Sequence, residues 1–155
     1  MSTSERLTEL GIELPAVVAP LAAYVPATRT GNLVYTAGQL PIQDGELVAT
    51  GKVGAEVSPE DAAAAARLCG LNAMAAVHAL VGIDSVVKVV KVVGFVASAP
   101  GFSGQPGVVN GASELFGDVF GEAGSHARSA VGVSELPRNA PVEVEVIVQV
   151  AEGDG

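Results

Sequence analysis

Arg128 is the residue of this sequence best suited to bind an anion, because the chain holds only eight Lys and Arg residues against 17 Asp and Glu. It opens a predicted strand over residues 128–133, directly after a glycine-containing turn. A planar guanidinium matches a carboxylate and binds it through two parallel hydrogen bonds. The alternative is a structural ion pair with Glu143 or Glu145, and such pairs are common. From the residues alone, both roles remain open.

Glu143 and Glu145 form the second candidate group, because residues two apart on a strand point to the same face of a sheet. Paired carboxylates perform acid–base chemistry when their surroundings push their pKa values apart. The alternative is that both glutamates are solvated or paired at an interface between subunits. The pattern indicates a charged strand face and leaves its use open.

The remaining residues with reactive side chains give weaker signals. His126 lies in the turn before Arg128, where a histidine could be functional, whereas His78 and Cys69 lie inside a predicted helix. The two histidines lack metal-ligand spacing, and a lone cysteine inside a helix is typical of a core position. The sequence holds neither a phosphate-binding loop nor a nucleophile elbow. We therefore expect neither a metal nor a cofactor.

The composition limits the class of protein. The chain has 155 residues, a net charge of -9 and 49% apolar residues, and its mean hydropathy is +0.45. We expect one domain over residues 1–155, with residues 1–20 as an N-terminal arm. The acidic balance argues against nucleic-acid binding. One cysteine, an N-terminus without a signal-like apolar segment, and apolar runs far shorter than about 20 residues predict a cytoplasmic protein that does not span a membrane.

Several elements are predicted to position these residues. The clearest is a helix over residues 59–81, with Ser58 as its cap and Gly82 as its stop. Gly38 lies inside a strand pattern, which indicates a bulge or a close approach to the backbone. Asp44-Gly45 predicts a tight turn. The other expected elements are strands over residues 32–40, 86–97, 128–133 and 142–150 and a helix over residues 108–120.

The strand over residues 142–150 shows which way the candidate carboxylates point. Five valines alternate with Glu143, Glu145, Ile147 and Gln149, so the valines share one face and the glutamates share the other. The order of elements predicts an α+β fold, with a single sheet and two helices packed on one face. Two helices leave the opposite face uncovered, although it is partly apolar. That face predicts a homo-oligomer.

Three segments carry a family resemblance. They are Tyr24 with residues 31–41 (GNLVYTAGQLP), Val109-Asn110 at the start of the second helix, and residues 127–133 (ARSAVGV) with Leu136-Pro137 and residues 142–145 (VEVE). Together they span about residues 24–150 and resemble the signature of the Rid family, also called YjgF-type or L-PSP endoribonuclease-type proteins. The arm over residues 1–20 and the loop around Phe102 are typical of a longer side branch.

The resemblance implies a chorismate-mutase-like homotrimer with sites in clefts between subunits. It implies hydrolytic deamination of reactive imino and enamine acids to 2-keto acids and ammonia, without a cofactor. In the family pattern the signature arginine, here Arg128, binds the substrate carboxylate, and the acidic residue, here Glu143, helps to position water. Lining residues carried over from the pattern are Tyr24, Ala37, Gly38, Asn110 and Ala130.

This sequence departs from the family pattern at two lining positions. Ala130 stands where many members carry cysteine, so no thiol is needed here, and Ala37 replaces the usual serine. A different class of function also remains open, namely a trimer that senses small carboxylates without turnover or acts as a chaperone. The ribonuclease activity in the older family name is disfavoured by the net charge of -9.

Overall fold

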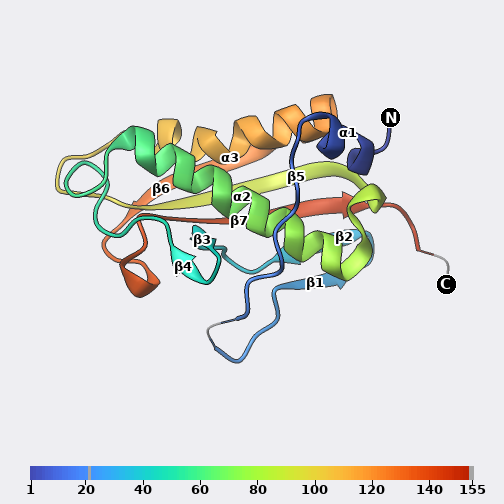
Figure 1. Cartoon of the computed structure of the whole chain (residues 1–155), viewed down its shortest axis with the longest axis horizontal. Coiled ribbons are helices and arrows are strands. Elements are labelled where there is room, and N and C mark those ends of the chain that lie inside the picture. The colour runs from blue at the N-terminus through green and yellow to red at the C-terminus, as the bar shows by residue number, and fades with distance from the viewer. Residues whose placement is uncertain (21, 154–155) are drawn as a thin grey trace.

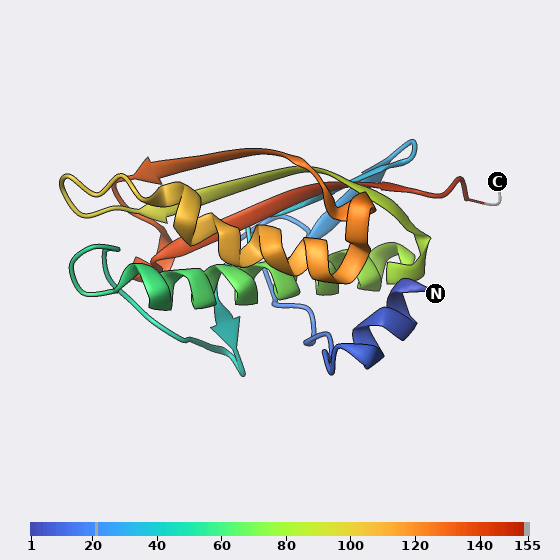
Figure 2. The ribbon, with the colours of Figure 1, turned by 90° about the horizontal axis from the view of Figure 1, so that it is seen from above.

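A five-stranded sheet with helices on one side forms the body of the protein (Figures 1 and 2). The computed structural model describes residues 1–20 and 22–153. The strand order is β1 (Ala27–Thr30), β2 (Leu33–Thr36), β7 (Val142–Val150), β5 (Val86–Ala97) and β6 (Ala127–Val133), and only β5 and β6 pair in parallel. The helices α2 (Pro59–Val81) and α3 (Gln105–Phe120) lie side by side on the same face. The predicted α+β layout is confirmed.

The core lies between β7, β5 and the two helices. All five alternating valines of β7 are at most 4% exposed, whereas the residues between them are more accessible. The predicted bounds of β7 and β5 are those of the structure. Burial of one valine stabilises a fold by about 1.5–3 kcal/mol, so the apolar face of β7 is a main source of stability.

Local signals place the helices. Ser58 caps α2, and its hydroxyl accepts a hydrogen bond from the Asp61 N–H at 3.1 Å. Gly82 ends α2 with a φ of 81°, a value that favours glycine. Helix α3 begins at Gln105, three residues before the predicted start, because Pro106 is compatible with a first helical turn.

Helix α2 has the length and apolarity of a membrane span, and it is the one helix among residues 1–20 and 22–153 that does. More than half of its most apolar 18-residue window is buried, as in the core helix of a folded domain. Its buried side contacts α3 and β7. Packing within the fold therefore accounts for its apolar character.

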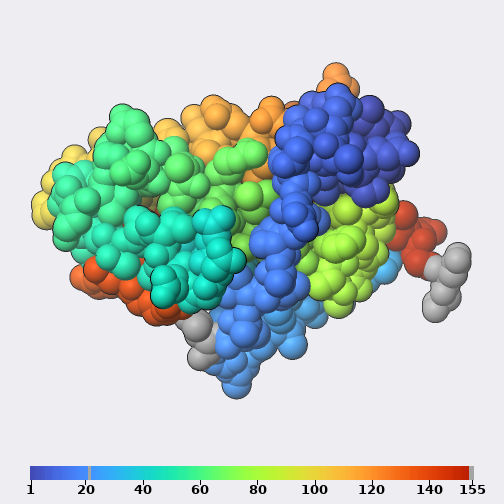
Figure 3. Space-filling model, viewed as in Figure 1, coloured from blue at the N-terminus to red at the C-terminus, as the bar shows by residue number. Residues whose placement is uncertain are grey.

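The N-terminal arm contains a helix that the sequence analysis missed. Helix α1 (Thr3–Glu9) begins with a capping box in which Ser2 and Glu5 satisfy each other's backbone N–H groups. Ser4 donates two hydrogen bonds of 2.7 Å to Asp84 in the short helix η1 (Ile83–Ser85), and these bonds lower the pKa of Asp84. After α1 the chain crosses the outer side of α2, beside the hairpin of β3 (Ile42–Gln43) and β4 (Glu46–Leu47) (Figure 3).

The strand predicted over residues 32–40 is shorter in the structure. Strand β2 ends at Thr36, whose Oγ1 accepts the hydrogen bond from the Val146 N–H at 3.0 Å in place of a backbone carbonyl. Strand β1, which was not predicted, pairs with β2 across a turn at Gly31. The predicted Asp44-Gly45 turn is confirmed, with both residues at positive φ between β3 (Ile42–Gln43) and β4 (Glu46–Leu47).

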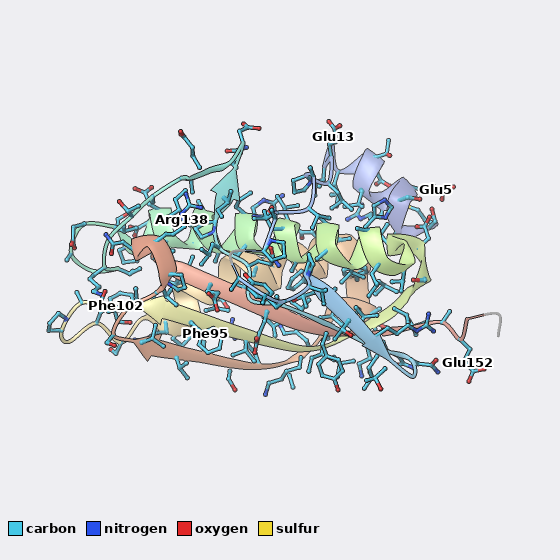
Figure 4. The ribbon with its side chains drawn as sticks, turned by 90° about the horizontal axis from the view of Figure 1, so that it is seen from below. Glu5, Glu13, Phe95, Phe102, Arg138 and Glu152 are labelled. Atoms are coloured by element: carbon cyan, nitrogen blue, oxygen red, sulfur yellow. The ribbon has the colours of Figure 1, made fainter. Side chains whose placement is uncertain are left out.

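No described helix covers the second face of the sheet. Its side chains follow from the strand register: Tyr35 lies beside Ile147, and Phe95 lies between Glu143 and Val131. Tyr35 is 38% exposed and Val131 is 44% exposed. Figure 4 shows side chains projecting from the sheet on the side away from the helices, with Phe95 labelled. We refer to this surface as the open face.

Glycine allows the close packing of α3 on α2. A Cβ added at Gly111 would overlap the backbone oxygen and carbon of Ala63, and backbone atoms give way less readily than a flexible side chain. By contrast, a Cβ at Gly117 on the same helix would meet nothing within 4 Å. Alanine at these two positions should therefore change the stability of the fold in opposite directions.

We expect Gly111→Ala to lower the free energy of unfolding by about 1–3 kcal/mol, because the helices must move apart. Gly117→Ala is the matched control and raises it by up to about 1 kcal/mol through helix propensity. Chemical denaturation at one fixed protein concentration measures both changes. Equal effects of the two substitutions would contradict the packing that we describe.

Candidate active site

Arg128 projects toward helix α3 from the outer strand of the sheet. Its Nη1 donates hydrogen bonds to Asn110 Oδ1 at 2.7 Å and to Ser113 Oγ at 3.2 Å. Asn110 and Ser113 lie three residues apart on α3 and thus share one helix face. Both acceptors are neutral, so they orient the guanidinium without cancelling its charge.

These contacts use one corner of the guanidinium. Among the described residues, no hydrogen bond or ion pair involves Nε or Nη2 of Arg128. That edge carries parallel N–H groups and matches the two oxygens of a carboxylate. The geometry fits the sequence-based expectation that Arg128 binds an anion through two hydrogen bonds.

Glu143 and Gly38 form a second cluster, and Gly38 in turn shares a small cavity with Tyr24. A Cβ at Gly38 would overlap the Glu143 carboxyl group, so the predicted close approach at this glycine is confirmed. Tyr24 and Gly38 line the same cavity of about 20 Å³, which is enough for one water molecule. Because Gly38 has no side chain, the carboxyl group of Glu143 lies directly against the backbone at that position.

The surroundings of Glu143 favour its protonated form. Partial burial raises the pKa of the Glu143 carboxyl above its ordinary value, and the nearby Glu145 raises it further. A carboxyl with a raised pKa exchanges protons closer to neutral pH, as a general base or acid must. Cys69 is buried beneath β7, and burial raises the pKa of its thiol, which fits the predicted core role.

The two clusters face opposite sides of the sheet. Arg128 is in register with Val92 and Val146, which point toward the helices, whereas Glu143 is in register with Phe95 on the open face. Within one chain, the ion pair between Arg128 and Glu143 or Glu145, weighed above as an alternative, is therefore wrong. The partners of Arg128 are on α3 instead.

The other predicted lining residues divide between the clusters. Asn110 binds Arg128 directly, and Ala130 shares its side of β6 and packs against the core. Ala37 is next to Gly38 in the chain, and its carbonyl accepts a hydrogen bond from the Gln39 side chain. Ser113 was not identified from the sequence, although its i,i+3 spacing from Asn110 indicates a shared helix face.

The larger cavities of the chain lie away from both clusters. Two cavities of about 470 and 540 Å³ are found between α2, the segment after α1 and the β3–β4 hairpin, and none of the predicted site residues lines them. Neither of these two cavities therefore serves the predicted site residues.

Comparison with known proteins gives consistent matches over nearly the whole chain. A sequence model described as YjgF/chorismate mutase-like, a description that also carries the word endoribonuclease, matches residues 4–150. Protein TCP17 of Trypanosoma cruzi is 45% identical over 145 residues, which cover 92% of this chain and 91% of that protein. The 2-iminobutanoate/2-iminopropanoate deaminase of Escherichia coli K12 is 36% identical over 135 residues, or 86% and 89% of the two chains.

Solved structures also match the fold of this chain over most of its length. Protein Atu1372 from Agrobacterium tumefaciens superposes with a TM-score of 0.87 and 47% identity, covering 97% of this chain and 94% of that chain. The structure of TdcF from E. coli with bound serine gives a TM-score of 0.61 and 25% identity, covering 88% and 93%.

The raised pKa of Glu143 gives a prediction for stability against pH. The folded chain favours the protonated carboxyl, so folding is opposed as the pH rises from the ordinary glutamate pKa through the raised one. We expect Glu143→Gln to have a higher melting temperature than the wild type at pH 7, and this difference to vanish at about pH 4 and below. Glu46→Gln, on the exposed hairpin, is the control. A lower melting temperature of Glu143→Gln at pH 7 would show that the carboxylate stabilises the fold instead.

Proposed function

The chain belongs to the YjgF/chorismate mutase-like family, and on that premise we propose that it hydrolyses reactive 2-imino acids, and the enamines that tautomerise to them, to 2-keto acids and ammonia. Relatives at 34–36% identity carry the name of this activity. The observation that carries the proposal is Arg128, whose Nη1 is held by α3 while its Nε–Nη2 edge is left for a carboxylate.

The chemistry requires little beyond orientation, because an imine carbon is already electrophilic. Arg128 binds the substrate carboxylate. A water molecule adds to the imine carbon as the Glu143 carboxylate takes up one of its protons, and return of that proton to nitrogen gives a neutral carbinolamine. The Glu143 carboxylate then carries the proton of the carbinolamine hydroxyl to the same nitrogen, so that the C–N bond breaks, the ketone forms and ammonia leaves. Orientation of this kind contributes several kcal/mol. The raised pKa of Glu143 favours its role as the proton carrier.

We place the site between two subunits. In one chain, Arg128 lies on the helix side of the sheet and binds Asn110 of α3, while Glu143 lies on the open face against Gly38, so one substrate cannot readily reach both groups. A second copy packed against the open face would cover its exposed Tyr35 and Val131 and bring Glu143 of one subunit toward Arg128 of the next. We propose a homotrimer, in which this contact closes by symmetry.

A second candidate function is a sensor that binds small carboxylates without turnover. Arg128 alone satisfies the requirement for binding, and the structure of a relative, TdcF, contains bound serine. RNA cleavage is disfavoured, because a net charge of -9 opposes binding of a polyanion. Turnover separates the deaminase from the sensor.

The first test uses 2-aminoacrylate, made by a serine dehydratase, with semicarbazide to trap the remaining imine. We expect the wild type to reduce trapping and Arg128→Ala to lose at least about a hundredfold of that activity, because two charged hydrogen bonds are lost. Arg128→Lys retains the positive charge but not the planar pair of N–H donors, so its activity should be intermediate between those of the wild type and Arg128→Ala. Arg67→Ala is the control, because Arg67 lies on α2. Unchanged trapping with the wild type, while 2-keto acids still bind, would support the sensor.

The second test mixes inactive subunits. If each site combines Arg128 of one subunit with Glu143 of another, refolding Arg128→Ala together with Glu143→Gln should rebuild about one intact site in four. Neither variant alone should be active. Sedimentation should give three times the mass of 15.4 kDa. A monomer, or mixtures as inactive as the separate variants, would argue against a shared site.

A further inference from the structure

His126 and Ser113 form a bonded pair that the proposed reaction does not use. The Nε2 atom of His126 lies 2.9 Å from Ser113 Oγ, and Nδ1 lies 2.7 Å from the carbonyl oxygen of Gly124. Gly124 ends the short helix η2 (Gly121–Gly124), which leads from α3 into β6. The same Ser113 hydroxyl accepts a hydrogen bond from Arg128. Three side chains are thus linked in a row.

The chemistry of these groups orders the protons along the row. A carbonyl oxygen only accepts, so Nδ1 of His126 carries a hydrogen and donates it to Gly124. In the neutral imidazole, Nε2 is then an acceptor, and the Ser113 hydroxyl donates a hydrogen bond to it. This directs the remaining lone pairs of Ser113 Oγ toward the N–H of Arg128.

We propose that His126 is a positioning residue, which acts through the Ser113 hydroxyl to orient the Arg128 guanidinium for carboxylate binding. The inference rests on the proposed role of Arg128 and deepens it. Asn110 and Ser113 both bind Nη1, so together they set the plane of the fork, and its Nε–Nη2 edge is left without a hydrogen bond among the described residues. Without an acceptor at His126 Nε2, the Ser113 hydroxyl is free to rotate, and its oxygen then accepts the hydrogen bond from Arg128 less well.

A purely structural role for His126 is the alternative. Its ring meets Phe116 edge to face, with centroids 6.0 Å apart and an interplanar angle of 86°. Phenylalanine at position 126 would keep this ring contact and lose both hydrogen bonds. Glutamine would retain an acceptor near the place of Nε2. These two substitutions separate positioning from packing.

The experiment measures binding of 2-oxobutanoate to the full chain by titration calorimetry, with folding checked by circular dichroism. We expect His126→Phe and Ser113→Ala each to weaken binding by about three- to tenfold, the size of one hydrogen bond. The double variant should be no weaker than Ser113→Ala alone, because both changes break the same row. His126→Gln should recover most of the affinity. Ser125→Ala, at an exposed neighbour, is the control.

Two results would overturn the inference: wild-type affinity in a folded His126→Phe, or losses in the two single variants that multiply in the double variant. If His126→Phe does not fold, Ser113→Ala and His126→Gln carry the same comparison. Nitrogen NMR of the His126 ring supplies a readout unrelated to catalysis. It should show hydrogen on Nδ1, and hydrogen on Nε2 alone would contradict the row. Absence of turnover would remove the deaminase proposal and leave these binding results standing.

Discussion

Strand β7 lies between β2 and β5, and its residues alternate between the buried core and the open face of the sheet. Its five valines must fill the space beneath α2 and α3, where they are almost fully buried. The strand period then fixes Glu143 and Glu145 on the other face, whatever else would suit them. A slip of one residue would expose the valines and bury the glutamates. The position of the candidate proton carrier therefore depends on the packing of the core.

The same constraint governs Arg128. Because Arg128 is in register with Val92 of the neighbouring β5, it shares the helix side of the sheet with Val92 and cannot meet Glu143 within one chain. The contacts of Arg128 come from α3, which packs on that side. A fold with one covered face thus produces two half-sites, and the proposed reaction depends on how copies of the chain join them.

Local patterns made part of this architecture predictable. The alternation over residues 142–150 and the signals at Ser58 and Gly82 act over a few residues, so strand β7 and helix α2 were placed correctly. Helix α1 was not predicted, although Ser2 and Glu5 form a capping box, because it has only seven residues and Pro15 and Pro20 follow in the same arm. The link between Arg128 and Ser113 spans 15 residues and depends on the packing of α3 beside β6, which no local pattern encodes.

The neutral partners of Arg128 have a consequence for how an anion arrives. The two ion pairs among the described residues engage Arg6 and Lys52, so the charge of Arg128 is left uncancelled on a chain with a net charge of -9. At long range the acidic surface repels a carboxylate, and only within a Debye length, about 8 Å at physiological ionic strength, does the guanidinium dominate. Moderate salt then has two opposite effects. It screens the repulsion and so speeds association of the anion. It also weakens the attraction between the bound anion and Arg128, and so speeds dissociation.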